Sequence, residues 1–157
     1  MLSFIGGTGA EGLGLALRFA SLGESIVIGS RNQERALAAA ESIRSQIPHA
    51  GVKGMDNVSA ASAADIVFIA VPYAAQSDTL NQLQGCIGDK IVVSTVVPMT
   101  VERRQARLVP VAEGSAAEQA QSLLPQARVV SAFHNLSAKL LLNLDAELHC
   151  DIVVCSD

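Results

Sequence analysis

The sequence predicts an α/β fold in which a mainly parallel sheet carries helices on both faces. Short runs rich in Ile and Val alternate along the chain with Ala-rich segments, in which apolar residues recur every three or four positions. This alternation is typical of successive strand and helix units around a parallel sheet. Half of the residues are hydrophobic and only 17% are charged, as expected of elements that are buried on more than one side.

The individual elements follow from these runs. Strands are expected near residues 2–5, 25–28, 52–54, 66–70, 90–94, 128–131 and 151–154. Helices are expected near residues 10–22, 32–46, 74–84, 115–124 and 134–142. Residues 97–114 contain two prolines and show no clean period, so we expect a loop or an excursion from the sheet there. Because 157 residues suffice for one well-formed core, we expect a single domain over residues 1–157.

A glycine-rich loop follows the first expected strand and precedes the first expected helix. The pattern G-x-G-x-x-G falls on Gly7, Gly9 and Gly12. In dinucleotide-binding domains, the first glycine permits a tight turn, the second lets the backbone approach a pyrophosphate, and the third allows close helix–strand packing. The alternative is a tight turn without a ligand. The strand–loop–helix context favours a Rossmann-type, doubly wound fold that binds a dinucleotide here.

The end of the second expected strand favours NADP(H) over NAD(H). NAD-binding domains usually carry an acidic residue about 20 residues after the glycines. Here a hydroxyl and a guanidinium, Ser30 and Arg31, replace that carboxylate. A guanidinium pairs with a 2′-phosphate, which a carboxylate would repel. Arg35 follows Arg31 by about one helical turn and can reach the same phosphate; the alternative is that both arginines are solvated surface charges.

Further candidates lie where expected strands end, at the sheet edge at which open α/β folds bind ligands. His134 follows the strand near 128–131 and either contacts a ligand or serves as a helix-cap or packing residue. Pro72 and Tyr73 follow the strand near 66–70 and either line the nicotinamide end of the cleft or form a packing turn. We expect no catalytic side chain and no metal site, because hydride transfer needs two rings held face to face.

Charge, hydropathy and cysteine content argue against several other classes of protein. The net charge of −4 disfavours a nucleic-acid or anionic-membrane partner, because both need clustered Lys and Arg. The most apolar run, residues 66–71, is far shorter than the roughly 20 residues that cross a bilayer. No secretion signal is expected at the N-terminus. Cys86, Cys150 and Cys155 form no CxxC pair, so we expect reduced thiols and a cytoplasmic location.

Several stretches from end to end of the chain together match one family. They are Ile5-Gly6-Gly7-Thr8-Gly9, residues 12–18, Ile28-Gly29-Ser30-Arg31, residues 90–94, Val97-Pro98, Ser115-Ala116-Ala117-Glu118, residues 129–135 and Cys150-Asp151. On these stretches the chain resembles the family of NADPH-dependent reductases of the deazaflavin coenzyme F420. The resemblance implies an oxidoreductase that exchanges a hydride between NADPH and F420, its small-molecule cosubstrate. A similar NADPH domain occurs in the membrane ferric reductases of the six-transmembrane epithelial antigen family, which makes a flavin the alternative acceptor.

The resemblance also implies which residues form the site. Thr8, Gly9, Ala10 and Glu11 would hold the pyrophosphate region, and Ser30, Arg31 and Arg35 would hold the 2′-phosphate. Tyr73, Ser77, Met99 and Ala138 would also line the NADP site, whereas Val97, Pro98 and His134 would border the deazaflavin. The chain departs from the family pattern at Asn32, where a second Arg can occur, and at Tyr73, where some members have Trp.

Family members continue into a helical C-terminal part that helps to form the F420 pocket and the dimer. We expect this chain to lack that part, because its residues end with the last expected strand. A homodimer is nevertheless compatible with the sequence. The alternative function is a non-catalytic or truncated NADP(H)-binding module, which needs a partner chain or the missing segment to complete its site.

Overall fold

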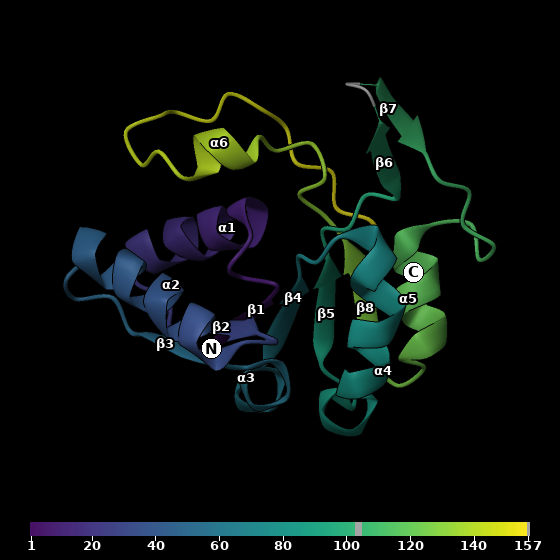
Figure 1. Ribbon diagram of the computed structural model, residues 1–157, viewed down its shortest axis with the longest axis horizontal. Helices are drawn as coiled ribbons and strands as arrows, with labels where there is room; N and C mark the ends of the chain where they lie inside the picture. The colour runs from purple at the N-terminus through teal and green to yellow at the C-terminus, as the bar shows by residue number, and fades with distance from the viewer. Residues whose placement is uncertain (103–104, 157) are drawn as a thin grey trace.

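The computed structural model describes residues 1–102 and 105–156, and its main feature is a six-stranded parallel sheet (Figure 1). The strand order is β3-β2-β1-β4-β5-β8, and every neighbouring pair runs parallel. The strands are β1 (Leu2–Ile5), β2 (Ile26–Ser30), β3 (Val52–Asp56), β4 (Ile66–Ile69), β5 (Ile91–Ser94) and β8 (Arg128–Ser131). The order reverses between β1 and β4, where α/β sheets open a crevice at their carboxyl edge.

Helices cover both faces of this sheet, so the predicted Rossmann-type, doubly wound fold is confirmed. One buried apolar cluster joins the sheet to α1, α2 and α6, and a second cluster joins it to α3, α4 and α5. The helices are α1 (Ala10–Ser21), α2 (Gln33–Gln46), α3 (Asn57–Ala63), α4 (Gln76–Ile87), α5 (Ala116–Leu123) and α6 (Ala138–Leu141), with a 3₁₀ turn η1 (Tyr73–Ala75) before α4. Every residue of β1 and β2 is buried, as expected for central strands.

Aromatic packing fixes the connection that follows β8. The rings of Phe4 and Phe68 stack with their centroids 4.5 Å apart. Phe133 contacts the same cluster, 6.0 Å from the Phe68 centroid and edge-on to Phe19. Its backbone has a φ of 68°, a conformation that residues other than glycine rarely adopt unless their surroundings impose it. The ring therefore anchors the turn that carries His134.

Helix α1 holds α6 through two residues one turn apart. A Cβ added to Gly14 would lie 2.5 Å from the Cβ of Leu141, so only glycine allows this close approach. The guanidinium of Arg18 donates to the carbonyls of Leu140 and Leu141 at 3.0 and 3.1 Å, and also to those of Asn143 and Ala146. These bonds satisfy carbonyls at the end of a helix that is only one turn long.

The loop or excursion expected at residues 97–114 contains two strands that were not predicted. The segment contains an antiparallel hairpin of β6 (Met99–Glu102) and β7 (Gln105–Leu108), which projects away from the sheet (Figure 1). Met99 pairs with Leu108, and Val101 pairs with Ala106, so the apolar side chains share one face of the hairpin. Each strand has only four residues, which is too short for the alternation to stand out in the sequence.

The prediction of a strand at residues 151–154 is wrong. The C-terminal segment meets β8 at a single antiparallel bridge, in which Ser131 and Cys155 exchange backbone hydrogen bonds of 2.8 and 2.9 Å. Ile152, Val153 and Val154 are exposed and join no strand. A run of β-branched residues favours extended backbone, but a strand also needs a continuous partner.

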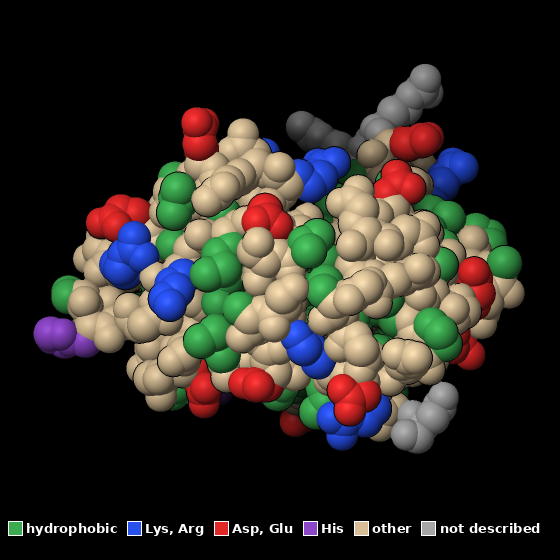
Figure 2. Space-filling view, turned by 90° about the horizontal axis from the view of Figure 1, so that it is seen from below, with side chains coloured by type: hydrophobic (Ala, Val, Ile, Leu, Met, Phe, Trp, Pro, Cys, Tyr) green, Lys and Arg blue, Asp and Glu red, His purple; other side chains and the backbone are tan. Residues whose placement is uncertain are grey.

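Two helices, α6 and α3, also differ from the expected ones. The helix expected at 134–142 is confined to α6, because the chain turns after Phe133 and the helix begins only where the Ser137 hydroxyl accepts from the Leu140 N–H at 3.4 Å. Helix α3 was absent from the expected helices. In the described part of the chain, no helix combines the length and apolar character needed to cross a membrane. On the face drawn in Figure 2, basic and acidic side chains are interspersed among neutral ones.

Candidate functional site

Three adjoining cavities form one groove along the carboxyl edge of the sheet. The first, of about 330 Å³, lies where β1, β2 and β4 end, and shares Gly9 and residues 70–72 with the second, of about 350 Å³. The second shares Val96, Val97 and His134 with the third, of about 280 Å³. We call the end at Ser30, Arg31 and Arg35 the arginine end. We call the end at Val97, Pro98 and His134 the histidine end.

The glycine loop leaves the sheet through a turn made by Gly6. Its φ is +79°, and an added Cβ would lie 2.7 Å from the Ala70 carbonyl oxygen. The tight turn therefore belongs to Gly6, whereas the sequence motif assigned it to Gly7. A Cβ on Gly7 would lie 2.7 Å from the Phe4 oxygen, and one on Gly12 would lie 2.9 Å from the Gly7 Cα. Both glycines are required by internal packing.

Gly9 is different, because the protein itself does not require glycine there. Its φ is −82°, and only the Gly6 oxygen, at 3.4 Å, would lie within 4 Å of an added Cβ. Gly9 precedes the first turn of α1 without a side-chain cap, and it lines both the first and the second cavity. The backbone N–H groups of this helix start are open to an anion that approaches along the groove.

The arginine end is held rigid by side-chain capping. Ser30 is buried at the end of β2, and its hydroxyl accepts from the Asn32 N–H at 3.2 Å. The Asn32 side chain in turn accepts from the Arg35 N–H at 3.0 Å and caps α2. Arg31 and Arg35 are exposed, and no carboxylate of the described residues lies within 4.0 Å of either guanidinium. Both charges can bind a phosphate.

Near the histidine end, burial disfavours the charged forms of two ionisable side chains. Desolvation by burial lowers the pKa of His134, although the side chain remains exposed overall, and its Nε2 lies 3.5 Å from the Ser131 hydroxyl. Burial raises the pKa of Glu11, whose Oε1 is buried without a hydrogen-bond partner in the described structure. Tyr73 lines the same cavity, and its hydroxyl accepts from the Gln119 side chain at 3.4 Å.

The structure brings most of the predicted site residues into the groove. Its lining includes Thr8, Gly9, Ala10, Glu11, Ser30, Arg31, Arg35, Pro72, Tyr73, Val97, Pro98 and His134. The predicted residues that line none of its three cavities are Gly7, Gly12, Ser77, Met99 and Ala138. Of these, Ser77 faces Gln119 at 3.4 Å, Met99 begins β6 and Ala138 begins α6.

Several other lining residues were not among the predicted site residues. They are Gly6, Asn32, Asn57, Ala70, Val71, Ala75, Thr79, Thr95, Val96, Ser115, Ala116, Ala117, Ser131 and Phe133. The Gly-Gly pair at Gly6 was a visible signal, because a second glycine beside the motif offers another place for a positive φ. Asn57 gave no comparable signal, since only the pairing of β2 with β3 brings it beside Ser30.

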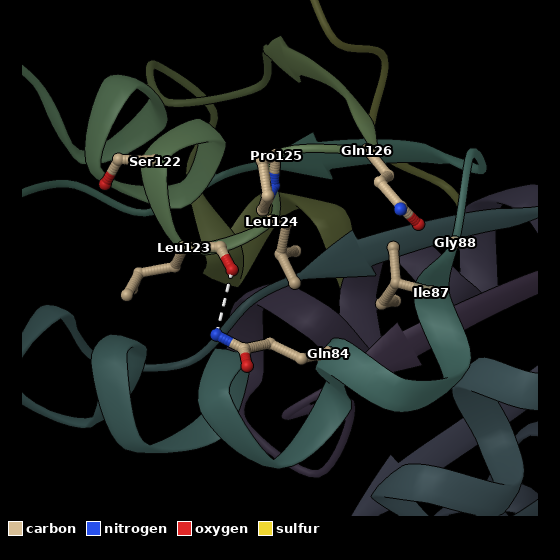
Figure 3. Close-up of a pocket in the computed structure, with 8 residues that line it drawn as sticks. All are labelled: Gln84, Ile87, Gly88, Ser122, Leu123, Leu124, Pro125 and Gln126. Carbon is tan, nitrogen blue, oxygen red and sulfur yellow. Dashed lines mark hydrogen bonds between the residues drawn. The ribbon is translucent and has the colours of Figure 1, made fainter.

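Another cavity, of about 380 Å³, lies at the opposite edge of the sheet, before β5 and β8 (Figure 3). It is lined by Gln84, Ile87, Gly88, Ser122, Leu123, Leu124, Pro125 and Gln126. The Gln84 amide crosses it to donate to the Leu123 carbonyl at 3.0 Å. None of these side chains is ionisable, so the groove remains the stronger candidate site. Within residues 1–102 and 105–156, no His, Cys, Asp and Glu cluster suits a metal ion.

Comparison with known protein families identifies the family to which this chain belongs. Residues 1–98 match the family model described as NADP oxidoreductase, coenzyme F420-dependent. The matched part contains the glycine loop, the arginine end and the Val97-Pro98 segment of the groove. The chain belongs to this family. The resemblance found in the sequence is thereby confirmed.

Individual relatives extend this F420-dependent family assignment over nearly the whole chain. The F420-dependent NADP reductase of Methanothermobacter thermautotrophicus is 41% identical over 165 aligned residues, which cover 99% of this chain and 70% of the relative. The reductase of the same name from Methanocaldococcus jannaschii is 38% identical, with 99% and 72% covered. A crystal structure of a candidate F420-dependent NADP reductase from Arthrobacter sp. FB24 gives a TM-score of 0.80 at 26% identity, covering 99% of this chain and 73% of that one.

Proposed function

We propose that this chain is an NADP(H)-dependent oxidoreductase domain that exchanges a hydride with coenzyme F420. The observation that carries the proposal is the groove at the switch point of the sheet, which is open at Gly9 and has two arginines but no carboxylate at its arginine end. Family membership and the names of the relatives support F420 as the second substrate.

The residues of the groove fit NADP(H) in a defined direction. The N–H groups at the start of α1 would hold the pyrophosphate beside Gly9, where the absent Cβ leaves room for it. The Ser30 hydroxyl and the guanidinium groups of Arg31 and Arg35 would bind the 2′-phosphate, for which a guanidinium is well suited. The nicotinamide would then lie toward the histidine end, beside Pro72 and Tyr73.

Bound NADPH and F420 together supply the hydride donor and acceptor, so the chain has to position them and exclude water. Val97 and Pro98 form an apolar wall beside His134, where a deazaflavin would stack. Glu11 and His134 would lie near the reacting rings, where burial raises the pKa of Glu11 and lowers the pKa of His134. We retain Ser77, Met99 and Ala138 as proposed NADP contacts, and Gly7 and Gly12 as residues that shape the loop.

Three further expectations form part of this proposal. Residues 1–157 would act as one NADP-binding domain. The free thiols of Cys86, Cys150 and Cys155 fit a cytoplasmic location. A homodimer is supported by β8, which ends the sheet beside the exposed residues 152–154, and light scattering after gel filtration would measure its mass.

The rival function, a non-catalytic NADP-binding module, is less well supported, because the relatives are named as reductases.

The test is NADPH oxidation by the purified chain with F420 as acceptor and with FMN or FAD in parallel. NADPH binding is first measured by fluorescence titration, with NADH as the matched control. We expect NADPH to bind more tightly than NADH and to be oxidised with F420. Turnover with a flavin alone would replace F420 by a flavin as the acceptor. Binding without turnover would favour the non-catalytic module, and absence of NADPH binding would refute the proposal.

A further inference from the structure

Asn57 places a buried polar atom without a partner at the arginine end of the groove. The residue is only 6% exposed, and it lines the first cavity together with Ser30, Arg31 and Arg35. Its Oδ1 is buried and accepts no hydrogen bond from any described residue. A buried acceptor without a donor is unfavourable, so such an atom calls for an explanation.

The position of Asn57 follows from the pairing of two strands. In the parallel register of β2 and β3, Ser30 lies opposite Asp56, so Asn57, which follows β3 and begins α3, comes beside the turn that carries Arg31. The carboxamide also uses the space at Gly29, where an added Cβ would lie 3.2 Å from the Asn57 Oδ1. The side chain is thus held at the adenosine side of the groove.

The surrounding structure gives the Asn57 carboxamide no structural role. The start of α3 is capped by Asp56, whose carboxylate accepts from the Ser59 N–H at 2.9 Å. Thr79, another buried polar residue of the same cavity, is satisfied, because its hydroxyl donates to the Ala75 carbonyl at 2.7 Å. Among the described residues that line the first cavity, Asn57 has a side-chain oxygen that is both buried and without a hydrogen-bond donor.

We propose that Asn57 is a further ligand-binding residue, which accepts a hydrogen bond from the adenosine half of bound NADP(H). This inference rests on the proposed function, and it adds a contact that reads the nucleoside rather than its phosphates. Two donors of that half are the ribose 3′-hydroxyl and the 6-amino group of adenine. Either one would satisfy an oxygen that lies beside the turn carrying Arg31.

The experiment compares Asn57→Leu with the wild-type chain by calorimetric titration of 2′,5′-ADP. Loss of one hydrogen bond predicts an affinity weaker by about 5- to 10-fold. The melting temperature of the free protein should stay the same or rise, because an apolar side chain removes the unpaired acceptor. Where Asn57→Leu does not fold, Asn57→Ala removes the same oxygen without adding volume, and the same loss of affinity is expected.

A matched control is Ser3→Ala. Ser3 is also buried with an unpaired hydroxyl, but it lines none of the three cavities of the groove. Its removal should leave the affinity for 2′,5′-ADP unchanged, so a loss shared by both variants would point to a general effect of the core and overturn the proposal.

A second ligand identifies the donor. The inosine analogue of 2′,5′-ADP carries a carbonyl in place of the 6-amino group. If the wild-type chain loses as much affinity for this analogue as Asn57→Leu loses for 2′,5′-ADP, the amino group is the donor; if it does not, the donor is the ribose hydroxyl. Equal affinity of the wild-type chain and Asn57→Leu for 2′,5′-ADP would overturn the role of Asn57. Failure of the wild-type chain to bind either NADPH or 2′,5′-ADP would instead refute the proposed function, and this inference with it.

Discussion

The arginine end and the histidine end of the groove are built from different parts of the fold. The arginine end lies on β1, β2 and the starts of α1 and α2, where the strands are fully buried and capping bonds link Ser30, Asn32 and Arg35. The histidine end lies on connections, between β5 and β6 and after β8, beside a hairpin whose described residues are all exposed. One end is shaped by regular structure and the other by loops.

This difference suggests a division of labour along the groove. The rigid end carries fixed positive charge, which suits a phosphate that every NADP(H) molecule brings. The looped end carries apolar walls and polar side chains, which suit a flat ring system whose identity varies between enzymes. Substitutions at the arginine end should therefore change cofactor binding. Substitutions near the histidine end should have smaller effects, such as a change in how stability depends on pH.

The largest effect is expected for Gly6→Ala. A methyl group at a φ of +79°, only 2.7 Å from the Ala70 oxygen, should lower the free energy of unfolding by about 3 kcal/mol and prevent NADPH binding. Gly9→Ala is the control, because it should change stability by less than about 0.5 kcal/mol and still weaken NADPH by about tenfold. Urea unfolding and fluorescence titration measure both. Equal destabilisation by the two variants would remove the distinction between a packed and an open glycine.

An intermediate effect is expected for Arg31→Ala. Loss of charge-assisted hydrogen bonds to the 2′-phosphate should weaken NADPH by about 10- to 150-fold, while NADH changes by less than about twofold. Arg44→Ala is the matched control, because Arg44 pairs with Glu41 at 2.6 Å and lies outside the groove. Titration with both dinucleotides decides the matter. Similar losses for NADPH and NADH would contradict the assignment of the arginine end.

The smallest effect is expected for Glu11→Gln, and it depends on pH. Burial raises the pKa of Glu11 above its ordinary 4.5, so the folded protein favours the neutral acid. The corresponding stability is present below about pH 4.5 and is lost as the pH rises through the folded-state pKa. Glutamine stays neutral, so the melting temperature of the variant relative to wild type should be higher at about pH 7.5 than at about pH 4. A pH-independent difference would contradict this ionisation.

Much of the fold was predictable from the sequence because its central strands are continuous apolar runs. The runs near 2–5 and 128–131 became β1 and β8 with those boundaries. The run at 151–154 looked equally apolar but forms only the bridge through Cys155, because pairing depends on what lies beside a segment in space. The hairpin at 99–108 was missed for the converse reason, since its two short strands stabilise each other.

The site was predictable where its residues are adjacent in the sequence. The glycine loop and the Ser30–Arg35 segment each form one local strand–turn–helix unit, so spacing alone indicated their place. Asn57 lies more than twenty positions after Ser30 in the sequence and joins it only through the β2–β3 register. No local pattern marks such a residue, because its neighbours come from a different strand.

By itself, the sequence of this chain determined the parallel α/β architecture, the glycine loop and the two arginines that follow β2. These features depend on local periodicity and on the conformational and charge properties of single residues. Only the tertiary structure decided that Gly6 makes the turn, that Gly9 is open, that Asn57 faces the groove and that Phe133 fixes His134. The physical reason is that burial and hydrogen-bond partnership are properties of neighbours in space, which packing brings together from distant positions in the chain.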